Sequence, residues 1–131
     1  KISFDKQNKT YTSVNYQNEL NDTNSLSNNF VRDILEDSNG DIWVGTIRGL
    51  NKLKQDAIGD VTFTSYLHDP ENKNSLSNNY VLDAFQASDG HLYVGTFGGG
   101  LNQIEASGAS GEYDDEDMSD DSRLREAHYM R

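Results

Sequence analysis

The sequence contains no cysteine and only one proline, and the lack of cysteine limits the kinds of site that the chain can form. Without cysteine the protein has no disulfides, no thiolate metal sites and no cysteine nucleophiles. The one proline, Pro70, falls in a predicted loop. No apolar run approaches the roughly 20 residues that a membrane-spanning helix needs, and no signal peptide is recognisable. Because position 1 is Lys, we expect a mature or excised segment. Because it has no apolar span, we expect no membrane contact by this segment.

Positive charge is also scarce, with 11 Lys and Arg against 22 Asp and Glu and a net charge of −11. Such a balance repels phosphate backbones and anionic lipids, so it disfavours nucleic acid and membrane surfaces as partners. Only 34% of the residues are apolar, although a domain of this size buries about two-thirds of its unfolded surface. We therefore expect that part of the chain stays solvated or that other surfaces complete its core.

The acidic residues are concentrated at the C-terminus. Residues 106–131 open with a linker-like run of Ala, Ser and Gly and continue with a dense acidic stretch that resists packing. We interpret this segment as a linker and flexible acidic tail, whose residues 119–131 are compatible with a short helix. A docking peptide and an addition derived from expression are both open interpretations, and the abrupt change in composition favours an origin foreign to the rest.

An internal repeat dominates residues 1–105. The run NSLSNNFVRDILEDSNGDIWVGTIRG at residues 24–49 returns as NSLSNNYVLDAFQASDGHLYVGTFGG at residues 74–99, with 14 identities in 26 positions. Looser echoes precede and follow each copy. The repeat unit is therefore about 50 residues long, and the chain holds two units.

Each unit has the local signals of strands and turns. Residues 42–47 and 92–97 are nearly continuous apolar strands, as expected when both faces of a sheet are covered. Asn39-Gly40 and Asp89-Gly90 predict hairpins with type I′ turns, in which both central residues need positive φ. Strands are predicted at residues 30–36, 42–47, 50–54 and 61–67, and residues 80–105 supply the first three strands of a second set. No window of residues 1–105 shows helical periodicity.

Four short antiparallel strands in a repeated unit of about 50 residues indicate an all-β fold made of β-propeller blades. Residues 2–5 match a third strand and residues 10–16 a fourth, so the chain holds about two blades within residues 1–16, 30–67 and 80–105. Two blades cannot close a ring of about four to eight. We therefore expect an incomplete ring that needs other blades or other copies of the chain. Residues 10–16, from this chain or another, are candidates for the missing outer strand.

These repeats resemble the two-component regulator propeller repeat. The resemblance rests on the NSLSNN run, on the motif from Glu36 to Thr46 and on Gly49-Leu50-Asn51, and the second copy differs chiefly in having Tyr93 in place of Trp43. It implies the periplasmic sensor region of a hybrid histidine kinase, which binds an oligosaccharide, performs no chemistry and uses no cofactor. The rival interpretation is a structural module that forms a closed ring by oligomerisation. A propeller lyase or hydrolase is the third candidate.

The repeated asparagines Asn28, Asn29, Asn78 and Asn79 are the candidate ligand-binding residues, because they can present amides to sugar hydroxyls. The alternative is a purely structural role, in which these residues hold their own loop through Asx and Ser turns and Leu26 and Leu76 insert between blades. The remaining repeated residues are expected to be structural. They are the mid-strand aromatics Trp43 and Tyr93, the turn glycines Gly40 and Gly90, and Asp33 and Asp83, which we expect to bond a neighbouring blade's backbone rather than to form a carboxylate ring.

The spacing Asp37-x-Asn39-x-Asp41 resembles a calcium loop, but it lacks the bidentate glutamate and the second copy does not keep it. The three histidines have no metal-ligand spacing and no nucleophile to partner. We therefore predict no metal site and no catalytic residues.

Overall fold

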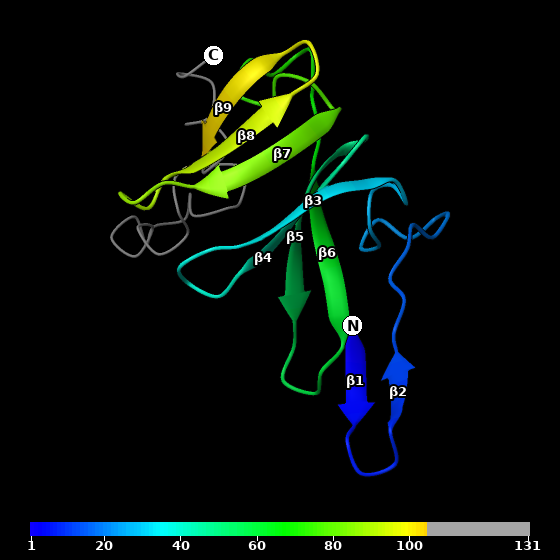
Figure 1. Ribbon diagram of the computed structural model, residues 1–131. Helices are drawn as coiled ribbons and strands as arrows, with labels where there is room; N and C mark the ends of the chain where they lie inside the picture. Colours follow the sequence, from blue (N-terminus) through cyan, green and yellow to red (C-terminus); the bar gives the residue numbers. More distant parts are fainter. Residues whose placement is uncertain (105–131) are drawn as a thin grey trace.

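A computed structural model describes residues 1–104, and these residues form nine β-strands joined by turns and loops (Figure 1). The strands are β1 (Ile2–Asp5), β2 (Thr10–Ser13), β3 (Val31–Glu36), β4 (Ile42–Thr46), β5 (Gly49–Gln55), β6 (Val61–Tyr66), β7 (Val81–Gln86), β8 (Leu92–Thr96) and β9 (Gly100–Ile104). The predicted all-β fold is confirmed. No helix that could span a membrane occurs in the part of the chain that the structure describes. The predicted tail, residues 106–131, lies outside the described residues.

The strands form three antiparallel sheets. The complete sheet has the order β3-β4-β5-β6, the second has the order β7-β8-β9, and β1 and β2 form a separate hairpin. The first two strands of each sheet pair identically, with Asp33 opposite Gly45 in one and Asp83 opposite Gly95 in the other. The sheets are therefore one four-stranded blade and the first three strands of the next, left open as predicted.

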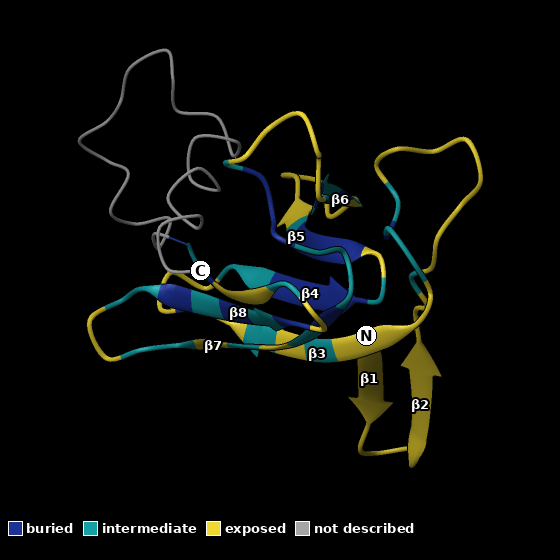
Figure 2. Ribbon diagram, turned by 90° about the horizontal axis from the view of Figure 1, so that it is seen from above, coloured by how far each residue is buried: buried dark blue, intermediate teal, exposed yellow. Residues whose placement is uncertain are grey.

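The two sheets pack face to face, and β7 lies against β3 and β4 (Figures 1 and 2). The main core fills the space between them. It contains buried side chains from both blades: Trp43, Leu50, Tyr66, Leu76, Val81, Leu92, Val94 and Ile104. A smaller cluster of Leu26, Val44 and Phe63 covers the other face of the first blade. Because a blade covers its apolar faces with neighbouring structure, burial is concentrated in β4, β5 and β8 and is low in β1 and β2 (Figure 2).

The hairpin loops differ from the predicted type I′ turns. Gly40 has φ +85°, but Asn39 is not among the residues with positive φ. The Gly40 N–H donates to the Asp37 carbonyl oxygen, and the Asp37 N–H donates to the Asp41 carbonyl oxygen. This is a three-residue loop with a single left-handed glycine at its end. The second copy repeats it at Gly90, with φ +96°.

Several predicted strands are shorter than expected. β3 begins at Val31 instead of residue 30, and β4 and β8 end at Thr46 and Thr96 instead of residues 47 and 97. β2, which was predicted as a fourth strand over residues 10–16, ends at Ser13. β6 ends at Tyr66 instead of residue 67. In both places the chain leaves the sheet to begin the long loop that leads to the next blade.

Those long loops are built identically, 50 positions apart. The Ser25 hydroxyl accepts the Glu19 N–H in the first loop, as the Ser75 hydroxyl accepts the Asp69 N–H in the second. Each loop is then fastened to its own blade by a fully buried asparagine. Asn51 Oδ1 accepts the Ser27 N–H at 3.0 Å, and Asn102 Oδ1 accepts the Ser77 N–H at 3.2 Å. The repeat in the sequence is thus a repeat of hydrogen bonds.

Candidate ligand site at the loop face

The first long loop forms one wall of an open hollow of about 400 Å³. Polar residues between positions 18 and 28 line it, together with Arg48 from the β4–β5 turn and with Ser65 and Leu67 from the end of β6. Antiparallel pairing brings these segments together, because Thr46 lies opposite Gly49 and Leu50 lies opposite Tyr66. Three segments distant in sequence therefore share one end of the blade. The hollow offers amides, hydroxyls and a guanidinium, which are groups that bind sugar hydroxyls.

Sequence reasoning missed most of the residues that line this hollow, and Arg48 is the one that brings a positive charge to it. Its side chain is exposed, while its backbone N–H donates to Thr46 Oγ1 and fixes the turn. The equivalent position in the second copy is Gly98, so Arg48 breaks the repeat. A position at which two otherwise similar copies differ is less constrained by the fold, and this difference was the available signal. Glu19 and Asp22 also line the hollow, so it carries both signs of charge.

The four candidate asparagines use their side-chain oxygens within the loops. Asn28 Oδ1 accepts the Phe30 N–H, and Asn29 Oδ1 accepts the Asn18 N–H. Asn78 and Asn79 do the same for the N–H groups of Tyr80 and His68. Of the four, only Asn28 lines the hollow. In residues 1–104 no hydrogen bond uses the amide nitrogens of these four side chains, so the Asn28 nitrogen is the group that it can offer to a ligand.

Asp33 and Asp83 occupy equivalent positions in different surroundings. Asp33 Oδ2 accepts the backbone N–H of Ala84, from the next blade, at 2.8 Å. Asp83 is exposed on the outer face of β7, where the described part of the chain provides no donor for its carboxylate. Asp33 thus belongs to the interface between the two blades, whereas Asp83 lies at the corresponding position on an uncovered face.

The repeated aromatic residues, Trp43 and Tyr93, also occupy equivalent positions in different surroundings. Trp43 is 2% exposed and faces the second blade, whereas Tyr93 is half-buried and stacks on Phe85 at 5.7 Å between ring centroids. Gly40 and Gly90 lie in the hairpin loops away from the hollow. The two aromatic residues therefore lie on blade faces and the two glycines lie at hairpin tips. None of the four lines the candidate ligand site.

The Asp37 loop has its oxygens engaged by the protein. Asp37 is buried and accepts hydrogen bonds from the N–H groups of Asn39 and Asp41 and from Trp43 Nε1. Asp41 pairs with Lys52 at 3.3 Å. No cluster of three or more acidic or histidine side chains suited to a metal ion occurs in residues 1–104.

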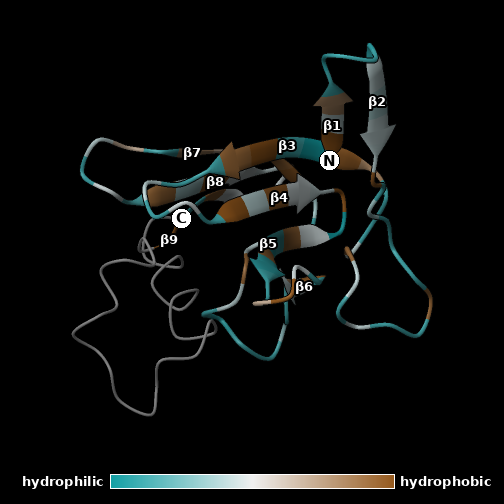
Figure 3. Cartoon of the chain, turned by 90° about the horizontal axis from the view of Figure 1, so that it is seen from below, coloured by the Kyte–Doolittle hydropathy of each residue, from teal (hydrophilic) through white to brown (hydrophobic). Residues whose placement is uncertain are grey.

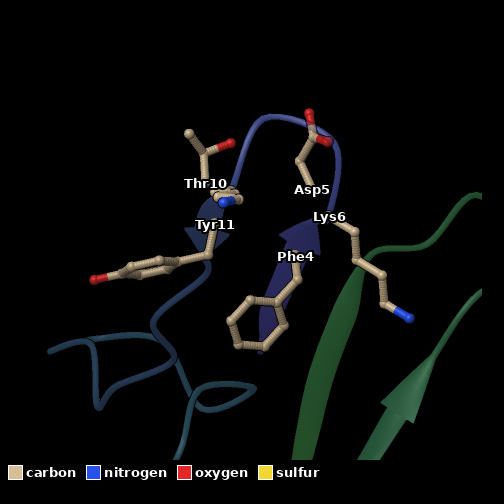
Figure 4. Close-up of a pocket in the computed structure, with 6 residues that line it drawn as sticks. Phe4, Asp5, Lys6, Thr10 and Tyr11 are labelled. Atoms are coloured by element: carbon tan, nitrogen blue, oxygen red, sulfur yellow. The ribbon is translucent and has the colours of Figure 1, made fainter.

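A second hollow lies on the N-terminal hairpin and encloses about 420 Å³ between Phe4, Lys9 and Tyr11 (Figure 4). The rings of Phe4 and Tyr11 are 6.1 Å apart on one side of the hairpin, and both are largely exposed. Asp5 accepts the Asn8 and Gln7 N–H groups and the Asn8 side-chain amide. These bonds, led by the Asn8 N–H, lower the pKa of Asp5. Since only the hairpin lines this hollow, the loop-face hollow is the better candidate site.

The architecture defines the molecule as a set of β-propeller blades. Residues 25–48 and 75–98 each match the family model of the two-component regulator propeller, and each match lies within one copy of the internal repeat. No curated protein matches the chain.

Solved structures share the fold. One is the extracellular domain of a protein assigned as a hybrid two-component system, BT3049, from B. thetaiotaomicron, with 28% identity and a TM-score of 0.58 over 79% of this chain. Another is that of BT4673 from the same organism, with 22% identity and a TM-score of 0.55 over 78% of this chain. The aligned part spans 14% and 12% of those two chains, respectively. This protein is therefore comparable to a small sector of such a domain.

Proposed function

We propose that residues 1–104 are part of the extracytoplasmic, ligand-sensing propeller of a hybrid two-component regulator, and that they bind an oligosaccharide without transforming it. The observation that carries the proposal is the hollow at the loop face, where the exposed Arg48 and the Asn28 amide lie together. The repeat family supports the regulator, and the extracellular domains with the same fold support a location outside the cytoplasm, which we take to be the periplasm.

The same hollow lies next to a contact between the blades. The Gly49 N–H, one residue after Arg48, donates to the Asn79 carbonyl oxygen of the second blade's loop at 2.6 Å. A bulkier residue does not fit at Gly49, because a Cβ there would be 2.8 Å from the Tyr66 carbonyl oxygen. A ligand that moves the Arg48 turn therefore moves the junction of two blades. This coupling is how binding would alter the geometry of a larger sensor.

The test is direct binding of a panel of neutral and acidic oligosaccharides, measured by calorimetry and by NMR chemical shifts. We expect saturable binding that shifts the amide signals of residues 18–28 and 47–49. Arg48→Ala should weaken binding at least tenfold, since it removes a charge-assisted hydrogen bond of about 1.5–3 kcal/mol. Arg32→Ala is the matched control, because Arg32 is also exposed but lies outside the hollow.

Three results contradict the proposal in different ways. Absence of binding across the panel rejects oligosaccharide sensing. Binding that Arg48→Ala leaves unchanged places the site elsewhere on the chain. Cleavage or elimination of a bound sugar, seen by mass spectrometry, replaces a sensor with an enzyme.

A further inference from the structure

Two apolar faces of the described chain are uncovered, and they lie on opposite sides of the paired blades. On the outer face of the second blade Phe85 is 58% exposed and Leu101 is 42% exposed. On β3, on the side away from β7, Ile34 is 64% exposed and Val31 is 40% exposed. Figure 3 shows the apolar character of both β3 and β7.

The interface between the two blades shows what covers a face of this kind. Val81 is completely buried over Gly45, where an added Cβ would approach Val81 Cγ1 to 2.5 Å. The Ala84 N–H donates to Asp33 of the first blade. The interface therefore has an interlocking valine and glycine and a hydrogen bond from backbone to carboxylate.

The two uncovered faces carry the same parts, 50 positions away. Gly95 and Asp83 on the second blade correspond to Gly45 and Asp33, and Val31 on the first blade corresponds to Val81. A Cβ at Gly95 would meet no valine; its nearest neighbours would be Asp83 Oδ1 at 3.0 Å and the Asp83 carbonyl oxygen at 4.0 Å. One face thus keeps an empty position over a glycine, and the other presents an exposed valine.

The backbone donors point to the same pairing. Ile34 corresponds to Ala84, and its N–H donates to Oδ1 of its own Asp33 at 2.9 Å. Ala84 has the same choice, since Asp83 precedes it, but it donates to Asp33 of the neighbouring blade. In the one interface that the structure describes, the donor thus bonds the carboxylate of the preceding blade and not its own neighbour.

We infer that copies of this chain associate head to tail, with the uncovered β7–β9 face of one copy on the uncovered β3 face of the next. Val31 of the second copy packs over Gly95 of the first, and the Ile34 N–H donates to the Asp83 carboxylate. The contact repeats the interface that already exists inside each copy. It does not depend on the proposed ligand.

The strand register agrees with this arrangement. Ile104 of β9 corresponds to Leu53 of β5, because they lie opposite Leu92 and Ile42 in equivalent strands. In the first blade, Leu53 of β5 pairs with Phe63 of β6. The residue 50 positions before Phe63 is Ser13 of β2, and Ser13 pairs with Ile2 of β1. Ile104 of one copy and Ile2 of the next thus reach the same register position.

The free edge of β9 can therefore add to residues 13–16 of the next copy, which supplies the fourth strand that the described second sheet lacks. The addition conflicts with the existing hairpin only at Lys1 and Ile2, where Lys1 pairs with Val14. Head-to-tail contacts close into a ring when the rotation allows it. Rings of about four to eight blades correspond to about two to four copies.

Sedimentation velocity and native mass spectrometry of the full chain test the inference. We expect one closed species of about two to four copies at micromolar concentrations. Phe85→Glu blocks the β7–β9 face, and Ile34→Glu blocks the β3 face; both side chains are exposed within a single copy, so folding should be retained. Each variant alone should sediment as a single chain. Mixed one to one, they should form a heterodimer through the two faces that remain intact.

The matched control is Ile58→Glu, because Ile58 is 83% exposed at the β5–β6 hairpin tip and belongs to neither face. It should assemble as the parent does. Circular dichroism and Trp43 fluorescence check that every variant is folded, and Asp83→Lys replaces Phe85→Glu if that variant is not. A single-chain parent at tens of micromolar overturns the inference. A folded pair of variants that stays monomeric when mixed, or a dimer that both variants retain, overturns it as well.

Discussion

The indole Nε1 of Trp43 donates a hydrogen bond to Asp37 Oδ2 at 2.9 Å, and both residues are almost completely buried. The same carboxylate holds the hairpin loop closed through the N–H groups of Asn39 and Asp41. In the second copy both partners change together, to Ala87 and Tyr93. A buried indole N–H needs an acceptor, whereas the half-exposed Tyr93 does not need one from this loop.

Asp37→Ala should therefore lower the free energy of unfolding by about 3 kcal/mol, because it removes three bonds to a charged acceptor and leaves the Trp43 N–H unpaired. Urea unfolding followed by circular dichroism measures this change. Trp43→Phe and the double variant complete a cycle. We expect a coupling of about 1–2 kcal/mol between the two residues, and additive effects would show that the hydrogen bond is not what couples them.

The glycines that face each blade interface give a matched pair. A Cβ at Gly45 would overlap Val81 Cγ1, while one at Gly95 meets only an exposed carboxylate oxygen. Gly45→Ala should destabilise the chain by about 2 kcal/mol through overpacking, and Gly95→Ala by less than about 0.5 kcal/mol. The comparison is made by thermal unfolding at concentrations at which both variants sediment as single chains. Equal losses would contradict the packing of Val81 over Gly45.

Sequence reasoning predicted the blades because the repeat preserves the residues that each blade needs for itself. Leu26 and Leu76 are both buried, and Asn51 and Asn102 fasten both loops. The predicted turn type was wrong because an Asn-Gly pair is compatible with more than one type of hairpin loop. Here Asp37 and Asp41 close a loop of three residues, so only Gly40 needs a left-handed backbone.

The candidate site was harder to predict, because no single segment contains it. Arg48, Ser65 and the loop before Asn28 meet only after four strands have paired in register. The repeated asparagines attracted attention because they recur, yet recurrence marks what every blade needs. Residues that differ between the copies, such as Arg48, are where a specific function can reside without cost to the fold.

The buried asparagines predict how the loop face is held. Asn51 Nδ2 donates to Ser27 Oγ and to the Val44 carbonyl oxygen. Asn51→Asp is nearly isosteric, but it replaces both donors by an anionic acceptor. We expect a loss of about 3 kcal/mol and faster hydrogen exchange at Ser27. The control is Asn72→Asp: Asn72 Oδ1 accepts the Asn74 N–H, as Asp22 already does for Asn24 in the first copy. That variant should match the parent, and a large loss there would point to a general effect of added charge.

The second hairpin loop predicts a pH response. Asp89 Oδ1 accepts the His91 N–H at 3.0 Å, and Asp89 Oδ2 lies 3.1 Å from His91 Nδ1. The backbone bond, followed by the side-chain bond, lowers the pKa of Asp89 below its ordinary 3.8. A depressed pKa means that the stabilisation is present above the unfolded value and is lost as the pH falls through the folded one.

NMR titration of the side-chain carboxyl carbons measures this pKa directly. His91→Ala removes the side-chain contact but keeps the N–H, so it should raise the pKa of Asp89 only part of the way. Asp5, whose pKa the Asn8 N–H lowers in a distant hairpin, is the internal control and should not respond. If Asp89 titrates at or above its ordinary value in the parent, the hydrogen bonds that hold this loop do not form in solution.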